Sequence, residues 1–429
     1  MIVLRVMLIL SVIWAASTVI SSAKSSAQSA ESLASLVRQY LDAGHSDEAE
    51  RLLQRILSDE QASVKTVSQI IREERTYQSQ PTGVLPDEEI AVRGRSHQLS
   101  LFVPASYKSE QSYALIVCLH GYGFTGEEYL ERWRTRLGDE YLLACPTYPS
   151  GAWFTRQAEE LVSATIREVQ RRYHIDPDRV FLTGMSNGGI GAWLIGMHHA
   201  PLFAGIAPMA SGLDDVLMPF LANLRNTPIY IIHGAQDQVM PVHLSRTIAK
   251  QLDALGYPYV YREHEREHPI AGGHYFPKEE LPDLVSWFNR QRREPLPKRQ
   301  TVVRDGSHFQ PFNWVRLDAT DPIAVFSDDL VDKRDERIKR RVYAKLDASI
   351  SGNNRIEVKC ELVQRYSLFL NEQMIDVGQP LMVMTNGRVS FEGTVTPSVE
   401  TLLRQARLRQ DSQQLFPVQL TIAITKPAP

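Results

Sequence analysis

The sequence has few cysteines and little net charge. Only three cysteines occur in 429 residues, Cys118, Cys145 and Cys360, and such an odd, sparse set is no disulfide framework. Cys118 and Cys145 lie in apolar runs, which predicts buried free thiols. Because the net charge is only −3, the chain lacks the basic field that nucleic-acid-binding proteins present. We therefore expect no nucleic-acid partner.

Long apolar runs are also missing beyond the N-terminus, where none reaches the roughly 20 residues needed to span a bilayer. The N-terminus has Arg5, then an apolar run of about 15 residues, then small polar residues, which is the layout of a secretory signal. We predict a signal peptide over residues 1–27, with cleavage near Ala23 or Ala27, and a secreted or periplasmic protein. An uncleaved N-terminal membrane anchor is the alternative.

Residues 28–80 predict a helical preface and a linker. Apolar residues recur there at three- and four-residue intervals, the pattern of amphipathic helices. Gly44 interrupts the pattern, and Ser46 can cap the helix that follows. We expect a short helical hairpin, followed by a linker that contains proline and glycine, residues 78–88.

Residues 81–293 alternate between apolar strands and amphipathic helices. Runs such as "YALIVCLHG", "RVFLTG" and "PIYIIHG" are typical of buried parallel strands. This alternation predicts an α/β domain with a doubly wound sheet. After a basic linker with two prolines, residues 294–429 are mostly β, and Asn386-Gly387 between alternating runs predicts a hairpin. We expect a C-terminal domain that resembles a β-sandwich.

The most specific chemical motif is G-x-S-x-G at Gly184–Gly188. An apolar strand precedes it and a helix-like run follows, so it resembles the nucleophile elbow of α/β-hydrolases. Ser186 is the predicted nucleophile. In that fold the oxyanion is held by the N–H after the nucleophile and by an N–H near an HG sequence at the end of an earlier strand. Here those groups would be the amides of Asn187 and Tyr122.

A serine nucleophile needs a base, and the base needs an acid to orient it. Asp237 follows directly after the apolar strand "PIYIIHG" and is the predicted acid. Asp214 and Asp215 are weaker candidates because no apolar strand leads into them. The chain order of α/β-hydrolases then requires a histidine before the last helix.

The segment His264–His274, "HEREHPIAGGH", offers three histidines at that place. We predict His274 as the base, because Gly272-Gly273 before it allows a flexible, closely approaching loop. His268 is the alternative. His264 is expected on a strand, where a packing or surface position suits it better.

The same segment contains H-E-x-x-H, which binds zinc in metalloproteases when both histidines share one helix face. Pro258 and β-forming residues precede it, which favours a strand. Pro269 pushes His268 away from helical angles. The glycine that metzincins use is replaced by Ala271. We therefore expect no metal and no cofactor, and keep a zinc metalloprotease only as a minor alternative.

Together these motifs resemble the branch of α/β-hydrolases that contains esterases and poly(3-hydroxybutyrate) depolymerases and is related to prolyl oligopeptidases. The resemblance covers about half of the chain. It implies Ser186 as nucleophile, Asp237 as acid and His274 as base. The insert "EREHPIA" before His274 departs from the family pattern, and the helical preface and β-rich C-terminus lie outside it.

The expected function is that of an exported serine hydrolase, which cleaves carboxylic esters through an acyl-enzyme. The ester could be carbohydrate-linked or polymeric. Tyr148, Trp153 and Phe154 follow the C-terminal end of a strand, so we predict that they line the substrate pocket. A peptidase on the same fold and a non-catalytic binding protein remain alternatives.

Overall fold

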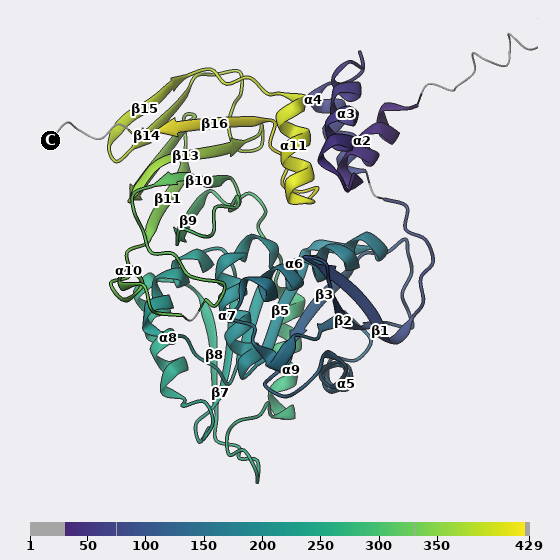
Figure 1. The fold of residues 1–429 in the computed structure, drawn as a ribbon, viewed down its shortest axis with the longest axis vertical. Coiled ribbons are helices and arrows are strands. Elements are labelled where there is room, and N and C mark those ends of the chain that lie inside the picture. The colour runs from purple at the N-terminus through teal and green to yellow at the C-terminus, as the bar shows by residue number, and fades with distance from the viewer. Residues whose placement is uncertain (1–30, 74, 331, 425–429) are drawn as a thin grey trace, which may run out of the picture. The chain divides into compact units, whose positions relative to one another are not determined.

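The computed structural model describes residues 31–73, 75–330 and 332–424 (Figure 1). The chain divides into two compact units, residues 1–73 and residues 74–429. The predicted signal peptide, residues 1–27, lies outside the described residues. Within the described ranges, none of the helices is both long and apolar enough to cross a membrane.

The first unit is helical. Serine side chains cap two of its helices: Ser32 accepts from the N–H of Ser35, and Ser63 accepts from the N–H of Thr66. The predicted cap at Ser46 is wrong, because Ser46 is already helical and His45 holds the cap position without a side-chain bond. The expectation of a two-helix hairpin was also incomplete, because the described part of this unit has a third helix. The three helices are α2 (Leu33–Asp42), α3 (Ser46–Leu57) and α4 (Val64–Arg72).

The second unit is built around an eight-stranded sheet with the strand order β1-β2-β4-β3-β5-β6-β7-β8. Strand β2 pairs antiparallel with both β1 and β4, whereas β4, β3, β5, β6, β7 and β8 are parallel to one another. This is the doubly wound α/β fold that the sequence predicted. The strands are β1 (Gly83–Val92), β2 (Arg95–Val103), β3 (Tyr113–Leu119), β4 (Leu142–Pro146), β5 (Ile175–Met185), β6 (Gly205–Met209), β7 (Ile229–Gly234) and β8 (Tyr259–His264).

Strand β1 corrects one sequence-based expectation. Residues 78–88 were expected to be a linker, but β1 starts at Gly83. It is an edge strand, and its pairing with β2 shifts register between Leu85 and Glu88, at Pro86. Proline lacks the N–H that a ladder needs, so it is tolerated at such an edge or irregularity. The proline therefore marks an irregular strand and not a linker.

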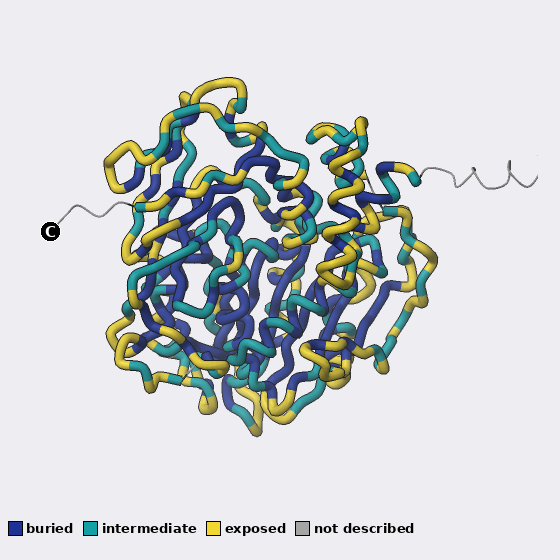
Figure 2. Tube along the Cα trace, turned by 45° about the horizontal axis from the view of Figure 1, so that its top comes forward, coloured by how far each residue is buried: buried dark blue, intermediate teal, exposed yellow. Residues whose placement is uncertain are grey.

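Helices cover both faces of the sheet, and β3 shows how its residues alternate between them. Leu115 and Val117 belong to one apolar core, while Ile116 and Cys118 belong to the other. The strands are accordingly buried in Figure 2. The first face packs against α6 (Arg156–Arg172), α7 (Asn187–His198) and α8 (His243–Leu255); the second packs against α5 (Gly126–Leu137) and α9 (Leu281–Arg290). Cys118 and Cys145 are buried and free, as predicted.

The C-terminal region contains two sheets, one with the order β10-β13-β16 and one with the order β15-β14-β12-β11-β9. Strand β11 contacts both β10 and β13 of the other sheet. Asn386 and Gly387, both with positive φ, form the predicted hairpin turn. Strand β9 and helix α11 were not predicted. The elements are β9 (Arg299–Arg304), β10 (Val315–Thr320), α10 (Glu336–Lys339), β11 (Ala344–Ser351), β12 (Arg355–Glu361), β13 (Val363–Leu370), β14 (Leu381–Thr385), β15 (Arg388–Gly393), α11 (Val399–Arg409) and β16 (Val418–Ala423).

This C-terminal region packs on the α6 and α7 side of the central sheet, and the two share one apolar core. Polar contacts reinforce the junction. The Asn223 amide, on the 3₁₀ helix η3 (Asp215–Leu224), accepts from the N–H of Val303 and donates to the Val303 and Met197 carbonyls. The division into compact units consequently falls after Glu73, and the boundary expected at residue 293 lies inside the second unit.

Candidate active site

The turn between β5 and α7 holds Ser186 in an unusual backbone conformation, with φ 59° and ψ −125°. Positive φ is costly for any residue with a Cβ, and such strain is concentrated at functional sites. The Ser186 N–H donates to the Met209 carbonyl on β6 at 3.1 Å, and the Ser186 carbonyl accepts from the N–H of Ile190. The strained serine is therefore held from both sides, at the C-terminal end of a central strand.

Glycines make this turn possible. A Cβ at Gly184 would lie 2.3 Å from the Gly188 carbonyl oxygen, and a Cβ at Gly188 would lie 2.1 Å from the Leu119 carbonyl oxygen. Real Cβ atoms do not approach a backbone oxygen so closely. The two glycines of the G-x-S-x-G motif thus allow α7 to begin directly against the end of β3.

Asp237 and His274 meet across two loops that follow β7 and β8. The His274 Nδ1 lies 2.8 Å from Asp237 Oδ2. The close approach again depends on glycine: a Cβ at Gly273 would lie 2.7 Å from the backbone N of Asp237, and one at Gly272, with φ +55°, would lie 2.7 Å from the Gln236 carbonyl oxygen. In the described part of the chain, no hydrogen bond joins Ser186 Oγ to the His274 ring; such contacts often tighten only when substrate binds.

The environment of Asp237 keeps it ionised. Burial alone would raise the pKa of its carboxyl group, but hydrogen bonds from His233, His274 and the N–H groups of Met240 and Val239 hold this pKa well below its usual range. His233 Nε2 lies 3.2 Å from Asp237 Oδ2 and 2.8 Å from the Met240 carbonyl oxygen. Both of these neighbours accept, so His233 Nε2 carries a proton and donates.

Sequence reasoning did not assign any part to His233. The residue ends an apolar strand in "PIYIIHG", and four positions separate it from Asp237. This spacing was the available signal, because the carboxyl end of a parallel strand is where functional side chains collect.

The other two histidines of the segment His264–His274 lie elsewhere. His264 ends β8, is buried, and its Nε2 lies 3.2 Å from the Tyr275 carbonyl oxygen. His268 is exposed and pairs with Gly272 through two backbone hydrogen bonds, of 2.6 and 2.9 Å. The H-E-x-x-H string therefore runs from a strand into a loop, and its two histidines do not share a helix face.

The loop after β3, which includes Tyr122, lies beside the strained turn. The position of a Cβ at Gly121 is 3.6 Å from the Met185 carbonyl oxygen. Within the described residues, the N–H groups of Tyr122 and Asn187 donate to no other group. Both N–H groups are therefore available as donors, which is what stabilisation of an oxyanion would require. The Tyr122 side chain itself is 72% exposed.

The buried ring of His120 fixes that loop. His120 Nε2 accepts from the N–H of Tyr148 at 3.0 Å, so Nδ1 carries the proton and donates to the Gly121 carbonyl oxygen at 2.9 Å. Burial lowers the pKa of His120 and favours this neutral form. In the sequence, the HG pair indicated where the Tyr122 amide lies, and it predicted no role for the His120 ring.

The three aromatic residues predicted to line the pocket have different surroundings. Trp153 is completely buried, and its indole N–H donates to the His120 carbonyl oxygen at 2.7 Å. Tyr148 is buried as well, and its hydroxyl contacts Thr155 Oγ1. The prediction is therefore wrong for Trp153, whose completely buried side chain packs inside the protein and lines no open pocket, and it stays a prediction for Tyr148. Phe154 is partly exposed.

The strand order, the strained serine between β5 and α7, and the paired aspartate and histidine after β7 and β8 define an α/β-hydrolase domain. A comparison with known families agrees: residues 151–289 match the phospholipase/carboxylesterase family model. This part of the chain is thus similar to ester hydrolases of the α/β-hydrolase superfamily, as the motifs indicated.

Known proteins resemble this domain at modest identity. An acyl-protein thioesterase 1 from Gibberella zeae is 26% identical over 223 residues, which are 43% of this chain and 92% of the relative. A probable feruloyl esterase C from Aspergillus terreus is 26% identical over 163 residues, 35% of this chain and 58% of the relative. Among solved structures, a thermostable esterase aligns with 26% identity and a TM-score of 0.42, covering 49% of this chain and 63% of that one. The chain therefore spans less than two thirds of the feruloyl esterase and of the thermostable esterase.

Proposed function

We propose that this protein hydrolyses carboxylic esters with Ser186 as nucleophile, His274 as base and Asp237 as the acid that orients the base. The carrying observation is the 2.8 Å contact between His274 Nδ1 and an ionised Asp237, in a domain whose strained turn presents a serine. The kinship with a thioesterase and a feruloyl esterase supports an acyl group as the part that is transferred.

The proposed reaction has two halves. Asp237 accepts a hydrogen bond from the Nδ1–H of His274. The Nε2 of His274 is therefore free to take the proton of Ser186 Oγ as the oxygen attacks the ester carbonyl. The N–H groups of Asn187 and Tyr122 stabilise the oxyanion. His274 then gives its proton to the departing alcohol, and an acyl-enzyme remains. Water, deprotonated by the same histidine, releases the acid and restores Ser186.

We also propose that the substrate is met outside the cytoplasm. The support is in the sequence, where Arg5 and an apolar run precede small polar residues at the N-terminus. An ester that is carbohydrate-linked or polymeric fits this setting. The peptidase alternative stays open as an outcome of the test, because nothing described at the site selects a peptide amine.

The test is hydrolysis of short p-nitrophenyl esters by the purified chain and by Ser186→Ala. We expect kcat to fall by about 10⁴-fold or more in the variant, because the nucleophile is lost while the fold stays intact. A folded Ser186→Ala protein that keeps wild-type activity would overturn the proposal. Cleavage of peptides in place of esters would favour the peptidase.

Two matched pairs of variants assign the base and the acid. His274→Gln and Asp237→Asn should each lower kcat by at least about 10³-fold. His268→Gln removes an exposed histidine from the same segment, and Asp214→Asn keeps the cap that Asp214 provides to η3. Both controls should retain activity. If His268→Gln lost activity and His274→Gln retained it, His268 would be the base.

A further inference from the structure

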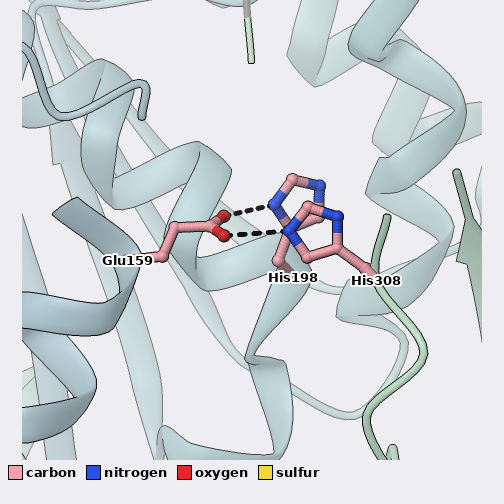
Figure 3. A group of neighbouring side chains, drawn as sticks. All are labelled: Glu159, His198 and His308. Carbon is pink, nitrogen blue, oxygen red and sulfur yellow. Dashed lines mark hydrogen bonds and ion pairs between the residues drawn. The ribbon is translucent and has the colours of Figure 1, made fainter. Parts of the chain in front are cut away.

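A second cluster of reactive side chains lies outside the active site, where the central domain meets the C-terminal region. Glu159 comes from α6, His198 is the last residue of α7, and His308 follows β9 (Figure 3). At most 4% of each of the three side chains is exposed. The proposed hydrolysis uses none of them, so their burial together needs a separate explanation.

The Glu159 carboxylate faces both imidazoles. Its Oε1 contacts His198 Nδ1, and its Oε2 lies 2.9 Å from His308 Nε2 (Figure 3). The two rings stack with their centroids 4.2 Å apart. One ligand atom from each of the three residues lies within 4.8 Å of the other two. One carboxylate and two imidazoles that converge in this way are the donor set of a transition-metal site.

A further carboxylate orients one of the imidazoles. Asp305 Oδ1 lies 2.7 Å from His308 Nδ1, and Asp305 itself accepts from the N–H of Phe326 at 3.2 Å. The Nδ1 proton of His308 is thereby fixed on the side of Asp305, and Nε2 points at Glu159. A histidine that binds metal usually donates its other N–H to a carboxylate in this manner, which orients the ring and raises its basicity as a ligand.

The cluster also contains imidazole nitrogens that lack a hydrogen-bond partner among the described residues. His198 Nε2 is buried and has no hydrogen-bond partner among the described residues. The same holds for His199 Nε2, which lies 3.7 Å from Glu159 Oε2, beyond hydrogen-bonding distance. Buried polar atoms in a purely structural network are normally satisfied. The His198 ring faces Glu159 through Nδ1, so its unpartnered Nε2 is not the atom that converges on the carboxylate. His199 Nε2 is the unpartnered nitrogen that could take up a ligand beside Glu159.

We propose that Glu159, His198 and His308 bind one divalent transition-metal ion, with zinc as the best match. Zinc favours imidazole nitrogen and carboxylate oxygen in a four-coordinate site, and His199, whose Nε2 lies 3.7 Å from Glu159 Oε2, is a candidate for the fourth position. A hard cation such as Mg²⁺ prefers oxygen ligands and suits the cluster poorly. Because the site is closed, the ion is structural: it joins α6 and α7 to the segment that follows β9.

The alternative to a metal ion in this cluster is a proton on His308. Burial would lower the pKa of His308, but its hydrogen bonds to Asp305 and Glu159 raise that pKa to about 9. A protonated His308, together with the buried Arg304, would balance the charges of the two carboxylates. A protein that binds no metal would therefore keep the cluster as an ion network, and this is the outcome that the experiment must separate.

The experiment measures metal content and thermal unfolding of the purified full chain. After removal of metal by a chelator and addition of Zn²⁺, we expect one zinc per chain to remain through gel filtration and the Tm to rise, whereas Mg²⁺ leaves the Tm unchanged. A folded wild-type protein that retains no zinc and shows no Tm response overturns the proposal, whatever the variants do.

Variants then locate the ion. His308→Gln should abolish retention of zinc, and Asp305→Asn, which keeps all three ligands, should weaken zinc binding about 10- to 100-fold. His243→Gln removes an exposed histidine from α8 and is the matched control, which should bind as the wild type does. Zinc that is lost in His268→Gln and kept in Asp305→Asn would place the ion in the loop before His274 and overturn the proposal.

Ester hydrolysis serves as an independent readout. The weaker zinc binding of Asp305→Asn should leave the turnover of p-nitrophenyl esters largely unchanged at low temperature, because the ion takes no part in the proposed reaction. Conversely, Ser186→Ala should bind zinc normally. Failure of the metal proposal and failure of the proposed hydrolysis are therefore distinguishable.

Discussion

At the scale of single residues, the turn around Ser186 depends on glycines, which have no Cβ atom. Gly188 lies so close to the end of β3 that a methyl group has no place, since its Cβ would stand 2.1 Å from the Leu119 carbonyl oxygen. The obstacle is backbone and not a flexible side chain, so either β3 or the start of α7 must move. Such a movement would displace the serine and its neighbouring N–H groups.

We therefore predict that Gly188→Ala lowers both stability and kcat. The overlap should cost on the order of 2 kcal/mol or more, and misplacement of the nucleophile should lower kcat by about 10²-fold or more. Denaturant unfolding and ester hydrolysis measure the two effects. Gly352→Ala is the control, because a Cβ there meets nothing within 4 Å. Equal behaviour of the two variants would contradict this account of the turn.

Residue by residue, the sequence was informative where the signal is local. The strand–turn–helix around Ser186 could be predicted because strand, glycines and helix are contiguous, and the place of Asp237 after β7 because an apolar run precedes it. The contact of His233 with Asp237 was not predicted: their spacing at the strand end was a signal, but the contact itself depends on how the loop after β7 folds back. Trp153 was predicted to face the substrate, but an aromatic residue near a strand end can equally lie beneath the loop.

At the scale of elements, the imidazole ring of His120 fixes the loop after β3 in the proposed site. His120 joins the Tyr148 N–H to the Gly121 carbonyl, while its own carbonyl accepts from Trp153. Tyr122, whose N–H is a proposed oxyanion donor, follows Gly121 in the chain. The direction of that N–H therefore depends on contacts that lie below the surface.

We predict that His120→Ala lowers kcat by about 10²- to 10³-fold, the usual effect of losing one oxyanion donor, with a smaller change in KM. Steady-state kinetics with p-nitrophenyl esters measures both constants. His97→Ala is the control, because His97 stacks on Tyr148 but makes no described contact with the loop. A rise in KM at constant kcat would show that His120 affects substrate binding instead of the transition state.

The elements themselves were predicted best where apolar residues are continuous. The strands β3, β4, β5 and β7 follow such runs, whereas β2 follows an alternating pattern and β8 follows β-forming residues. By contrast, β1 contains Pro86 and acidic residues, because an edge strand is not obliged to be apolar or to donate every N–H. Strand β9 begins at the end of the segment expected as a basic linker, and its burial depends on packing against η3, which no local pattern encodes.

At the scale of the whole molecule, buried charges join distant parts of the second unit. Arg293 follows α9 and is only 5% exposed on its side chain. Its guanidinium contacts Asp178 on β5 at 2.8 Å and Asp411 after α11 at 2.6 Å. The second of these partners is 118 residues away. The segment expected to separate two domains is thus anchored to both.

We predict that Arg293→Met destabilises the protein by about 3–5 kcal/mol, because two buried carboxylates lose their common partner. Arg290→Met, at the exposed last residue of α9, should change stability by less than about 0.5 kcal/mol. Denaturant unfolding, followed by fluorescence and circular dichroism, provides the measurement. We also expect the two probes to coincide for the wild type. Separate transitions for residues 74–293 and 294–429 would contradict the shared core.

Long-range groupings of this kind are what the sequence could not provide. Glu159 and His308 are 149 positions apart, and no motif connects them. The H-E-x-x-H string is compact and visible, yet its histidines lie on a strand and in an exposed loop. Proximity along the chain is a poor guide when side chains from separate elements meet in a core.

The positive φ of Ser186 has a consequence for how the protein can change over generations. Glycine adopts this backbone conformation freely, whereas a serine there costs on the order of 1–3 kcal/mol. A lineage selected only for heat resistance would therefore tend to replace Ser186 by glycine and become a sturdier, inert protein. Persistence of serine at this position in descendants of the chain would record continued selection for the reaction.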